Sequence, residues 1–292
     1  MAAASLARDV FGRRFQNPVL LASGTAGFGR ELAGVMPLER LGGLVTKAVS
    51  VEPRQGNRPP RVAEFPGGML NAVGLANPGL ERVREHDLPW LERHLQRPQV
   101  LVNVVGHAVE EFAAVVAGLD HFDRIAAFEL NLSCPNTERG GVDFGADPAT
   151  VERVVSVCRA RTARPLVVKL SPALPDVAGM ALVARDAGAD GVTLVNTMPG
   201  FLYRERSTTP RLGNGHGGVS GPPLLPVGVL ATRKVAERAP GWPIIGVGGI
   251  RSAEDARQYL RAGAQLVAIG TAALADPRLP FRVIRDLEAQ GG

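Results

Sequence analysis

The most informative chemical motif of the chain is Glu129-Leu-Asn-Leu-Ser-Cys-Pro-Asn-Thr137. Its first half indicates a buried strand that carries Asn131 to the carboxyl end, after which Ser-Cys-Pro turns the chain and leaves Cys134 above the strand ends. A free thiol has a pKa of about 8.5, which suits proton transfer near neutral pH when neighbouring cations favour the thiolate. Most cysteines are instead inert packing residues, and the apolar helical pattern around Cys158 indicates that role there. We therefore predict Cys134 as an acid–base residue.

Two lysines lie at the ends of apolar runs, Lys47 after the run that begins at Leu44 and Lys169 in the run that begins at Leu166. A buried ammonium group must be paired with an anion or lose its charge. Because no carboxylate ends any other expected strand, the two lysines predict an anionic ligand in a shared cavity. Two alternatives stay open: a lysine whose stem lies along an edge with its ammonium in water, and a Schiff-base lysine.

Glycines follow the last two apolar runs of the chain, at Gly248-Gly249 and at Gly270-Thr271. Barrels of parallel strands build a phosphate cradle at this place, where the absence of a Cβ lets the backbone approach the ligand. Plain tight turns are the alternative interpretation. The segment Gly213-Asn-Gly-His-Gly-Gly218 formally matches the dinucleotide motif G-x-G-x-x-G, but no strand runs directly into it, so we assign no dinucleotide site there.

The elements that must position these residues are short β-branched runs that alternate with helical patterns, as is typical of βα units around a parallel sheet. Several of the runs are apolar throughout, as strands buried on both faces should be. The eight runs predict a closed (β/α)8 barrel, the TIM barrel, rather than an open sheet. The expected strands are Pro18–Leu21, Leu44–Lys47, Val100–Val104, Ala127–Leu132, Leu166–Leu170, Gly191–Val195, Pro243–Val247 and Leu266–Ile269.

Amphipathic stretches between the strands predict helices, and Ser252-Ala-Glu-Asp255 predicts the N-cap of one of them. Two further segments, Ala48–Asn77 and Met198–Gly221, are rich in Gly, Pro and Arg and are too long for plain loops. Each follows the carboxyl end of a strand, so we expect both to lie on the catalytic face as lids or partner surfaces. The expected helices are Pro78–Leu95, Val109–Leu119, Pro148–Arg161, Val177–Ala187, Leu224–Arg238 and Ala253–Ala262.

The carboxyl ends of all eight expected strands carry polar residues or glycine. Such residues at one or two ends would carry no information, but their presence at every end predicts that this end of the barrel binds a ligand. In chain order the ends are Ala22-Ser23-Gly24, Thr46-Lys47, Asn103, Asn131, Lys169-Leu-Ser171, Asn196-Thr197, Gly248-Gly249 and Gly270-Thr271.

Length and composition limit the size of the fold and the class of ligand. The chain has 292 residues, 45% of them hydrophobic and 21% charged, which suits one large folded domain over residues 1–292. The formal net charge of +5 comes from scattered arginines, and aromatic residues are only 5%, so the pattern favours anionic ligands over a nucleic acid.

Two cysteines are too few for a disulfide scaffold or an iron–sulfur cluster, and the five histidines lack metal-ligand spacing. We therefore expect no metal. The N-terminus lacks the pattern of a secretory signal, and no apolar stretch approaches the roughly 20 residues that span a bilayer. These features predict a cytoplasmic protein without a membrane partner.

The strand-end residues and the cysteine motif resemble those of the class 1 dihydroorotate dehydrogenases. The resemblance covers nearly the whole chain, from Asn17-Pro-Val-Leu-Leu-Ala-Ser-Gly24 to Gly270-Thr-Ala272. The resemblance implies FMN as the redox group and oxidation of (S)-dihydroorotate to orotate in pyrimidine (UMP) biosynthesis. A base removes a proton from C5 while hydride passes from C6 to the flavin, and Cys134 matches the cysteine base of class 1. The most specific shared motifs are Thr46-Lys-Ala-Val49, Gly68-Met-Leu-Asn-Ala-Val-Gly-Leu-Ala-Asn-Pro78, Asn131-Leu-Ser-Cys-Pro-Asn136, Val168-Lys-Leu-Ser-Pro172 and Asn196-Thr197.

The same resemblance implies a set of binding residues at matching positions. Those implied to hold the substrate are Lys47, Asn71, Val73, Gly74, Leu75, Asn131, Asn196 and Thr197. Those implied to contact FMN are Ser23, Lys47, Ala48, Asn103, Asn131, Lys169, Val195, Gly221, Gly248, Gly249, Gly270 and Thr271. A lysine such as Lys169 would stabilise the negative charge that a flavin gathers on reduction.

Within class 1, the segment from Lys47 to Arg61 resembles the NAD-linked type more than the fumarate-linked type. The NAD-linked type implies a homodimer of catalytic subunits joined by a second subunit that carries FAD and an iron–sulfur cluster, a heterotetramer. Cys134 and Cys158 cannot build that cluster alone, which fits a subunit that hands its electrons to a partner.

Other functions stay open at this point. The nearest is a fumarate-linked homodimeric dihydroorotate dehydrogenase, followed by a dihydropyrimidine dehydrogenase-like flavoenzyme acting on uracil. A non-redox isomerase or lyase would use Lys169 as a Schiff-base lysine and the glycines for a substrate phosphate. A flavin-binding protein without turnover is the last alternative.

Overall fold

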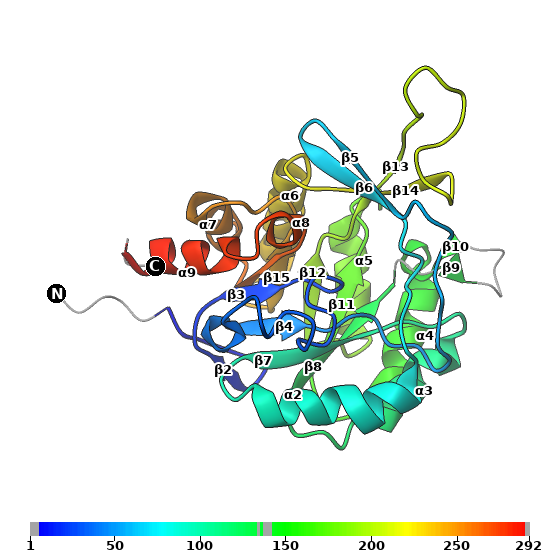
Figure 1. Ribbon diagram of the computed structural model, residues 1–292. Coiled ribbons are helices and arrows are strands. Elements are labelled where there is room, and N and C mark those ends of the chain that lie inside the picture. Colours follow the sequence, from blue (N-terminus) through cyan, green and yellow to red (C-terminus); the bar gives the residue numbers. More distant parts are fainter. Residues whose placement is uncertain (1–5, 133–134, 137–141, 290–292) are drawn as a thin grey trace.

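Eight short parallel strands close into a barrel in the computed structural model, which describes residues 6–132, 135–136 and 142–289 (Figure 1). Each strand pairs with its neighbours in chain order, and the last strand returns to pair with the first. The predicted TIM barrel and its eight strands are confirmed, with ends that differ by at most two residues. The strands are β3 (Val19–Leu21), β4 (Gly43–Val45), β7 (Gln99–Val104), β8 (Ile125–Asn131), β11 (Leu166–Leu170), β12 (Gly191–Leu194), β15 (Ile244–Val247) and β16 (Leu266–Ile269).

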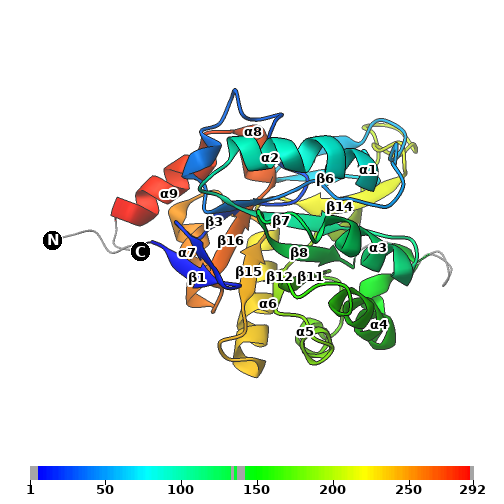
Figure 2. The ribbon, with the colours of Figure 1, turned by 90° about the horizontal axis from the view of Figure 1, so that it is seen from below.

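Helices surround the barrel (Figure 2). The predicted helix over Pro78–Leu95 is divided into α1, the π-helical η2 and α2. Ser252 accepts a hydrogen bond from the amide of Asp255 at 3.1 Å, so the predicted N-cap is confirmed. The helices are η1 (Leu38–Arg40), α1 (Leu80–Arg82), η2 (Val83–Asp87), α2 (Leu88–His94), α3 (Val109–Leu119), η4 (Phe144–Ala146), α4 (Pro148–Arg159), α5 (Val177–Asp186), α6 (Leu224–Arg238), α7 (Ala253–Arg261), α8 (Thr271–Ala275) and α9 (Leu279–Ala289). Among the described residues, no helix has both the length and the apolar surface to cross a membrane.

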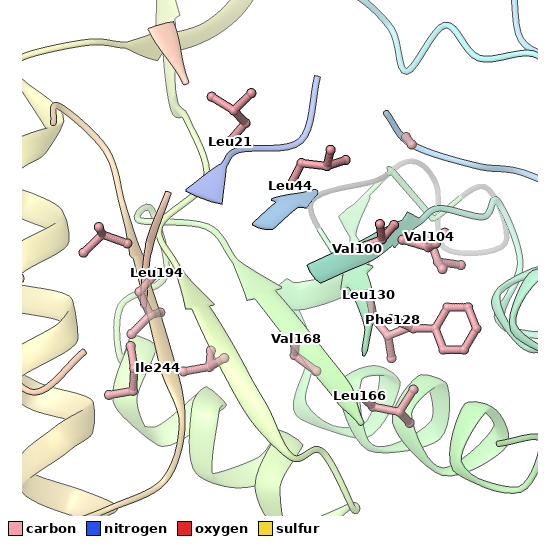
Figure 3. Packing of buried hydrophobic residues seen from close by; sticks show 14 of the residues in the cluster. Leu21, Leu44, Val100, Val104, Phe128, Leu130, Leu166, Val168, Leu194 and Ile244 are labelled. Atoms are coloured by element: carbon pink, nitrogen blue, oxygen red, sulfur yellow. The ribbon is translucent and has the colours of Figure 1, made fainter. Parts of the chain in front are cut away.

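The barrel strands are apolar on both faces because each face packs against a different core. Leu166 and Val168 of β11 belong to the outer core between the strands and the helices, part of which is drawn in Figure 3. Val167, the residue between them, belongs to the inner core inside the barrel. Side chains alternate along a strand, so this pattern fixes which residues of each strand point inward.

A short hairpin closes the amino-terminal end of the barrel. Its strands are β1 (Arg8–Val10) and β2 (Arg13–Phe15), which pair antiparallel. Val10 and Phe15 join the inner core, and Phe15 has no exposed surface. The bottom of the barrel is therefore sealed by apolar side chains, and only the opposite end is open to a ligand.

The two long insertions pair with each other, although they lie far apart in the sequence. They form a four-stranded antiparallel sheet in the order β13-β14-β6-β5, drawn in cyan and yellow in Figure 1. Its strands are β5 (Val62–Phe65), β6 (Gly68–Asn71), β13 (Met198–Phe201) and β14 (His216–Ser220). A further antiparallel pair joins β9 (Pro135–Asn136) to β10 (Val142–Asp143). Both insertions leave from strand carboxyl ends, so this sheet stands on the expected catalytic face.

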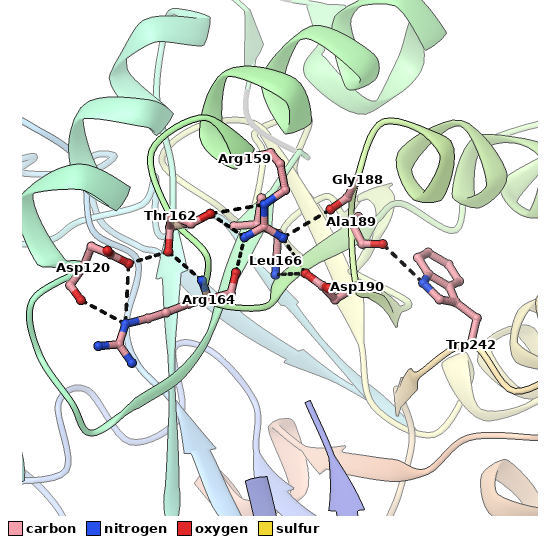
Figure 4. Close-up of polar contacts among 9 residues, drawn as sticks. All are labelled: Asp120, Arg159, Thr162, Arg164, Leu166, Gly188, Ala189, Asp190 and Trp242. Atoms are coloured by element: carbon pink, nitrogen blue, oxygen red, sulfur yellow. Dashed lines mark hydrogen bonds and ion pairs between the residues drawn. The ribbon is translucent and has the colours of Figure 1, made fainter. Parts of the chain in front are cut away.

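A polar network ties α4 to the loops at the other end of the barrel (Figure 4). Arg159 donates hydrogen bonds to the carbonyls of Thr162 and Arg164 and to the carboxylate of Asp190, the last at 2.8 Å. The same Asp190 oxygen accepts from the amide of Leu166 at 2.8 Å, where β11 begins. One guanidinium thus fixes the start of a barrel strand relative to the end of a helix.

Arg159→Ala is expected to lower the free energy of unfolding by about 2 kcal/mol, because the carbonyls of Thr162 and Arg164 lose a donor and Asp190 loses its ion pair. Arg153→Ala is the matched control on the same helix: its ion pair with Glu110 has partners that are 60% and 64% exposed. An exposed pair contributes only about 0.2–1 kcal/mol. Urea unfolding of the three proteins measures the difference, and equal losses for both variants would contradict the structural role of Arg159.

Candidate active site

The barrel interior changes from apolar to polar toward its open end. On β8, Ala127 belongs to the inner core, and Glu129 and Asn131 follow it on the same inward face. On the neighbouring strand β11, Val167 is followed in the same way by Lys169. All three polar residues are at most 7% exposed. A buried polar layer therefore lies on top of the apolar core.

Glu129 is the centre of this layer. Its carboxylate accepts hydrogen bonds from Asn103 Nδ2 on β7 and from Thr193 Oγ1 on β12, each at 2.7 Å. Lys169 Nζ lies 3.7 Å from the same carboxylate. Only carboxylates at the strand ends were considered from the sequence, which therefore did not reveal that Glu129, inside its strand, faces Lys169.

This ion pair changes the charge expected at the barrel mouth. The positive charge of Lys169 is balanced within the protein, so only Lys47 can supply an uncompensated cation from the expected pair. Lys47 follows β4 two residues after Val45, which is an inner-core residue, and it is partly buried. Within the described residues, Lys47 forms no ion pair with a carboxylate. A ligand anion at this mouth would therefore meet one lysine rather than two.

The side-chain oxygen of Asn103 is a hydrogen-bond acceptor for which the described residues supply no donor. The residue has no exposed surface, and because a carboxylate can only accept, the contact with Glu129 fixes which end of the amide faces it. The other end, Oδ1, is buried and has no hydrogen-bond partner among the described residues. Since an unsatisfied buried acceptor is costly, this atom indicates a place where a ligand N–H completes the layer.

Four residues expected to bind the substrate form a continuous set around the mouth. Asn196 Nδ2 donates to Asn131 Oδ1 at 3.2 Å, and Asn196 Oδ1 accepts from the amide of Thr197 at 2.9 Å. From the other insertion, Asn71 Nδ2 donates to the carbonyl of Gly218 at 3.2 Å. A Cβ on Gly218 would overlap Thr197, so these two residues are in close contact. The structure brings Asn71, Asn131, Asn196 and Thr197 together from three separate segments.

The loop Val73–Leu75, also expected to bind the substrate, has an unusual backbone. Gly74 and Leu75 have φ angles of 74° and 54°, in the left-handed region. A non-glycine residue is rare there, and Leu75 is held by packing against the outer core. Asn57 holds the loop through its backbone N–H, which donates to the Val73 carbonyl at 3.1 Å. Sequence reasoning did not assign Asn57, whose turn-like surroundings gave no sign of this contact.

The glycines at the carboxyl ends of β15 and β16 have different structural reasons. A Cβ on Gly249 would lie 2.6 Å from the amide nitrogen of Leu225, so the packing of α6 alone requires a glycine there. A Cβ on Gly270 would meet only ordinary contacts, the nearest being Ala22 Cβ at 3.6 Å. Gly270 also has φ −111° and ψ −98°, outside the regions that residues with a side chain favour, so its backbone conformation is one structural reason for the glycine.

The other residues expected at the cofactor site lie around the same end of the barrel. Ser23 donates to the Thr46 carbonyl at 2.9 Å, and Thr271 donates to Ser220 Oγ at 2.8 Å. Gly221 and Gly248 have positive φ angles of 97° and 126°. Ala48 and Val195 are buried.

Comparison with known proteins decides the family. The sequence profile of the family described as dihydroorotate dehydrogenase matches residues 5–290. The chain belongs to the dihydroorotate dehydrogenase family. Among its curated relatives, proteins named dihydroorotate dehydrogenase B (NAD(+)), catalytic subunit, are 44% identical in Pelobacter propionicus and 43% identical in Geobacillus kaustophilus. These matches cover 96% and 97% of this chain and 91% and 90% of the relatives.

Membership of the dihydroorotate dehydrogenase family narrows the alternatives. A dehydrogenase transfers electrons and needs no Schiff-base lysine. The family therefore argues against the isomerase or lyase interpretation.

The predicted base of this dehydrogenase, Cys134, lies outside the described residues. The other cysteine, Cys158, is fully buried in α4, and burial raises the pKa of its thiol to about 12. Such a thiol stays protonated near neutral pH, as expected of a packing residue. Within residues 6–132, 135–136 and 142–289, no group of three His, Cys, Asp or Glu side chains could hold a metal ion.

Proposed function

We propose that this protein oxidises (S)-dihydroorotate to orotate in the cytoplasm, as a step of pyrimidine biosynthesis. The proposal rests on one arrangement: Lys47 and the amides of Asn71, Asn131 and Asn196 around a single barrel mouth. Orotate carries a carboxylate and ring amide groups, which suit one lysine and several asparagines. Uracil lacks the carboxylate, so a dihydropyrimidine dehydrogenase-like activity would leave Lys47 without a partner.

FMN is the cofactor that we propose for this mouth. Two observations support its fit: the buried acceptor of Asn103 without a donor, and the open position beside Gly270. When bound, FMN supplies a two-electron acceptor for hydride. The residues that we propose to hold it are Ser23, Lys47, Ala48, Asn103, Asn131, Lys169, Val195, Gly221, Gly248, Gly249, Gly270 and Thr271.

The substrate residues act by binding and orienting the ring. Lys47 would neutralise the carboxylate, while Asn131 and Asn196 present their amides toward the ring polar groups. The loop of Val73, Gly74 and Leu75 would cover the substrate from the side of the insertion. Cys134 would take the C5 proton as the general base.

We further propose that electrons leave through a partner. The relatives of this chain are named as NAD(+)-linked catalytic subunits, and such a subunit works beside another. The partner would carry FAD and an iron–sulfur cluster and would join a homodimer of this chain in a heterotetramer.

Two measurements on the purified protein test this function. A flavin absorption band should accompany the protein, and dihydroorotate should bleach the band in the absence of oxygen. Dihydrouracil should not bleach it at a comparable rate, because it lacks the carboxylate. A colourless protein that cannot be reconstituted with FMN contradicts the cofactor, and a flavin that dihydroorotate leaves oxidised indicates a binding protein without turnover.

Asn71→Ala is expected to weaken orotate binding by about tenfold while FMN stays bound, because it removes one amide partner of the ring, worth about 1.4 kcal/mol. The contact of Asn71 with Gly218 fixes the amide on the insertion sheet. Asn214→Ala is the matched control, since Asn214 is exposed on the same insertion and its side chain donates to the His216 carbonyl rather than to any residue expected at the site. Orotate titration of the flavin spectrum measures both, and loss of FMN from Asn71→Ala would contradict its assignment to the substrate.

A further inference from the structure

Glu129 is a buried charge that the proposed reaction does not use. Its side chain is 1% exposed, and it lies inside the barrel beneath the mouth. Burying a carboxylate costs several kcal/mol unless charges and hydrogen bonds compensate it. The barrel interior below this layer is filled with apolar side chains, so an apolar residue at this position would match the pattern of the core.

The contacts of Glu129 fix two groups that face the mouth. Asn103 Nδ2 and Thr193 Oγ1 each donate to it at 2.7 Å, which holds the carboxylate in one orientation. Lys169 Nζ lies 3.7 Å away, which is too long for a hydrogen bond and short enough for a strong charge interaction. Glu129 therefore compensates the charge of Lys169 without taking its N–H donors.

We propose that Glu129 is a positioning residue that sets the reduction potential of the bound flavin through Lys169 and Asn103. This inference rests on the proposed function. A lone lysine beneath a flavin stabilises the negative charge of the reduced form. A carboxylate beside that lysine weakens this stabilisation, so the flavin is a stronger reductant when its electrons leave for the next acceptor.

The redox couple concerned, oxidised and reduced flavin, transfers two electrons. With FMN bound, dihydroorotate would lose a hydride from C6 to the flavin and a proton from C5 to the base, and would become orotate. Glu129 takes no part in this exchange. Its effect is on the relative stability of the oxidised and reduced flavin, and that quantity is measurable without turnover.

Glu129→Gln is the decisive variant, because it removes the charge and keeps the shape of the side chain. We expect it to strengthen binding of reduced FMN relative to oxidised FMN by about tenfold, which raises the midpoint potential by about 30 mV for two electrons. Thr193→Val keeps the charge and removes one hydrogen bond, and it should leave the potential near that of the wild type. Glu110→Gln removes an exposed carboxylate outside the barrel and serves as the second control.

Redox-dye titration of the bound flavin gives the potential, and flavin titration of the apoprotein gives the affinity. A Glu129→Gln potential that equals or falls below the wild-type value overturns the inference. An equal rise in Thr193→Val also overturns it, because hydrogen-bond geometry rather than charge would then set the potential.

If Glu129→Gln does not fold, variants of Lys169, the other member of the ion pair, test the inference. Lys169→Gln should lower the potential, whereas Lys169→Arg should keep it closer to the wild type, and an unchanged potential in Lys169→Gln would overturn the inference. A wild-type protein that binds no FMN, or whose FMN dihydroorotate does not bleach, contradicts the proposed function instead.

Discussion

Cys134→Ser is expected to slow reduction of the bound flavin by dihydroorotate by about 10²–10⁴, because general-base catalysis is worth that much and serine is a far weaker base near neutral pH. FMN binding and the fold should be unchanged. Rapid mixing with dihydroorotate under anaerobic conditions measures the rate of bleaching.

Cys158→Ala is the matched control, since that thiol is fully buried in α4 and its pKa is raised to about 12. It should lose some stability and keep the wild-type rate. A Cys134→Ser protein that bleaches at the wild-type rate at neutral pH would remove Cys134 from the mechanism.

The second large effect concerns electron transfer. Purified alone, this chain should be reduced by dihydroorotate yet should fail to reduce NAD⁺ at a useful rate. Its only G-x-G-x-x-G match, Gly213–Gly218, runs into β14 of the insertion sheet rather than from a strand into a helix, so it forms no dinucleotide loop. Cys134 and Cys158 also cannot supply a cluster by themselves.

Adding the cognate flavin and iron–sulfur subunit should restore NAD⁺ reduction. Steady-state assays with and without that subunit measure the difference, with fumarate as the competing acceptor. Rapid turnover with fumarate by the isolated chain would place it in the partner-free type and contradict the NAD-linked assignment.

Sequence patterns predicted the barrel well because its strands are buried on both faces. Val167 packs inside and Leu166 and Val168 pack outside, so the run is apolar without interruption and easy to recognise. The hairpin of β1 and β2 was missed because Arg13 and Arg14 are exposed and only its ends are buried. Helix α9 was not among the predicted helices, although its sequence shows a helical pattern. Phe281, Ile284 and Leu287 lie on one buried face.

The members of the candidate site stay predictions from the sequence, whereas the contacts between them could not be predicted from it at all. Glu129 was visible in the motif, but the side to which a strand residue points depends on register and on which face is the interior. The antiparallel sheet of the insertions was also missed, because its strands are defined by pairing between distant segments rather than by their own sequence. His216-Gly-Gly218 resembles a loop, and it becomes a strand only through pairing with β6 and β13. The organisation of residues 1–292 as a single domain stays a prediction.

The insertion sheet also determines when the site can exist during protein synthesis. Asn71 and Gly218, which its strands join, are 147 residues apart, whereas the barrel strands pair with neighbours in chain order, except where β16 closes the barrel on β3. A distant contact closes a long loop before it gains any stabilisation, so it forms late. On the ribosome, a chain that has emerged as far as β12 holds most of the barrel wall but only one side of the substrate site. The substrate side of the mouth is completed when β14 emerges and pairs with β6, and the glycines that follow β15 and β16 join the mouth later still.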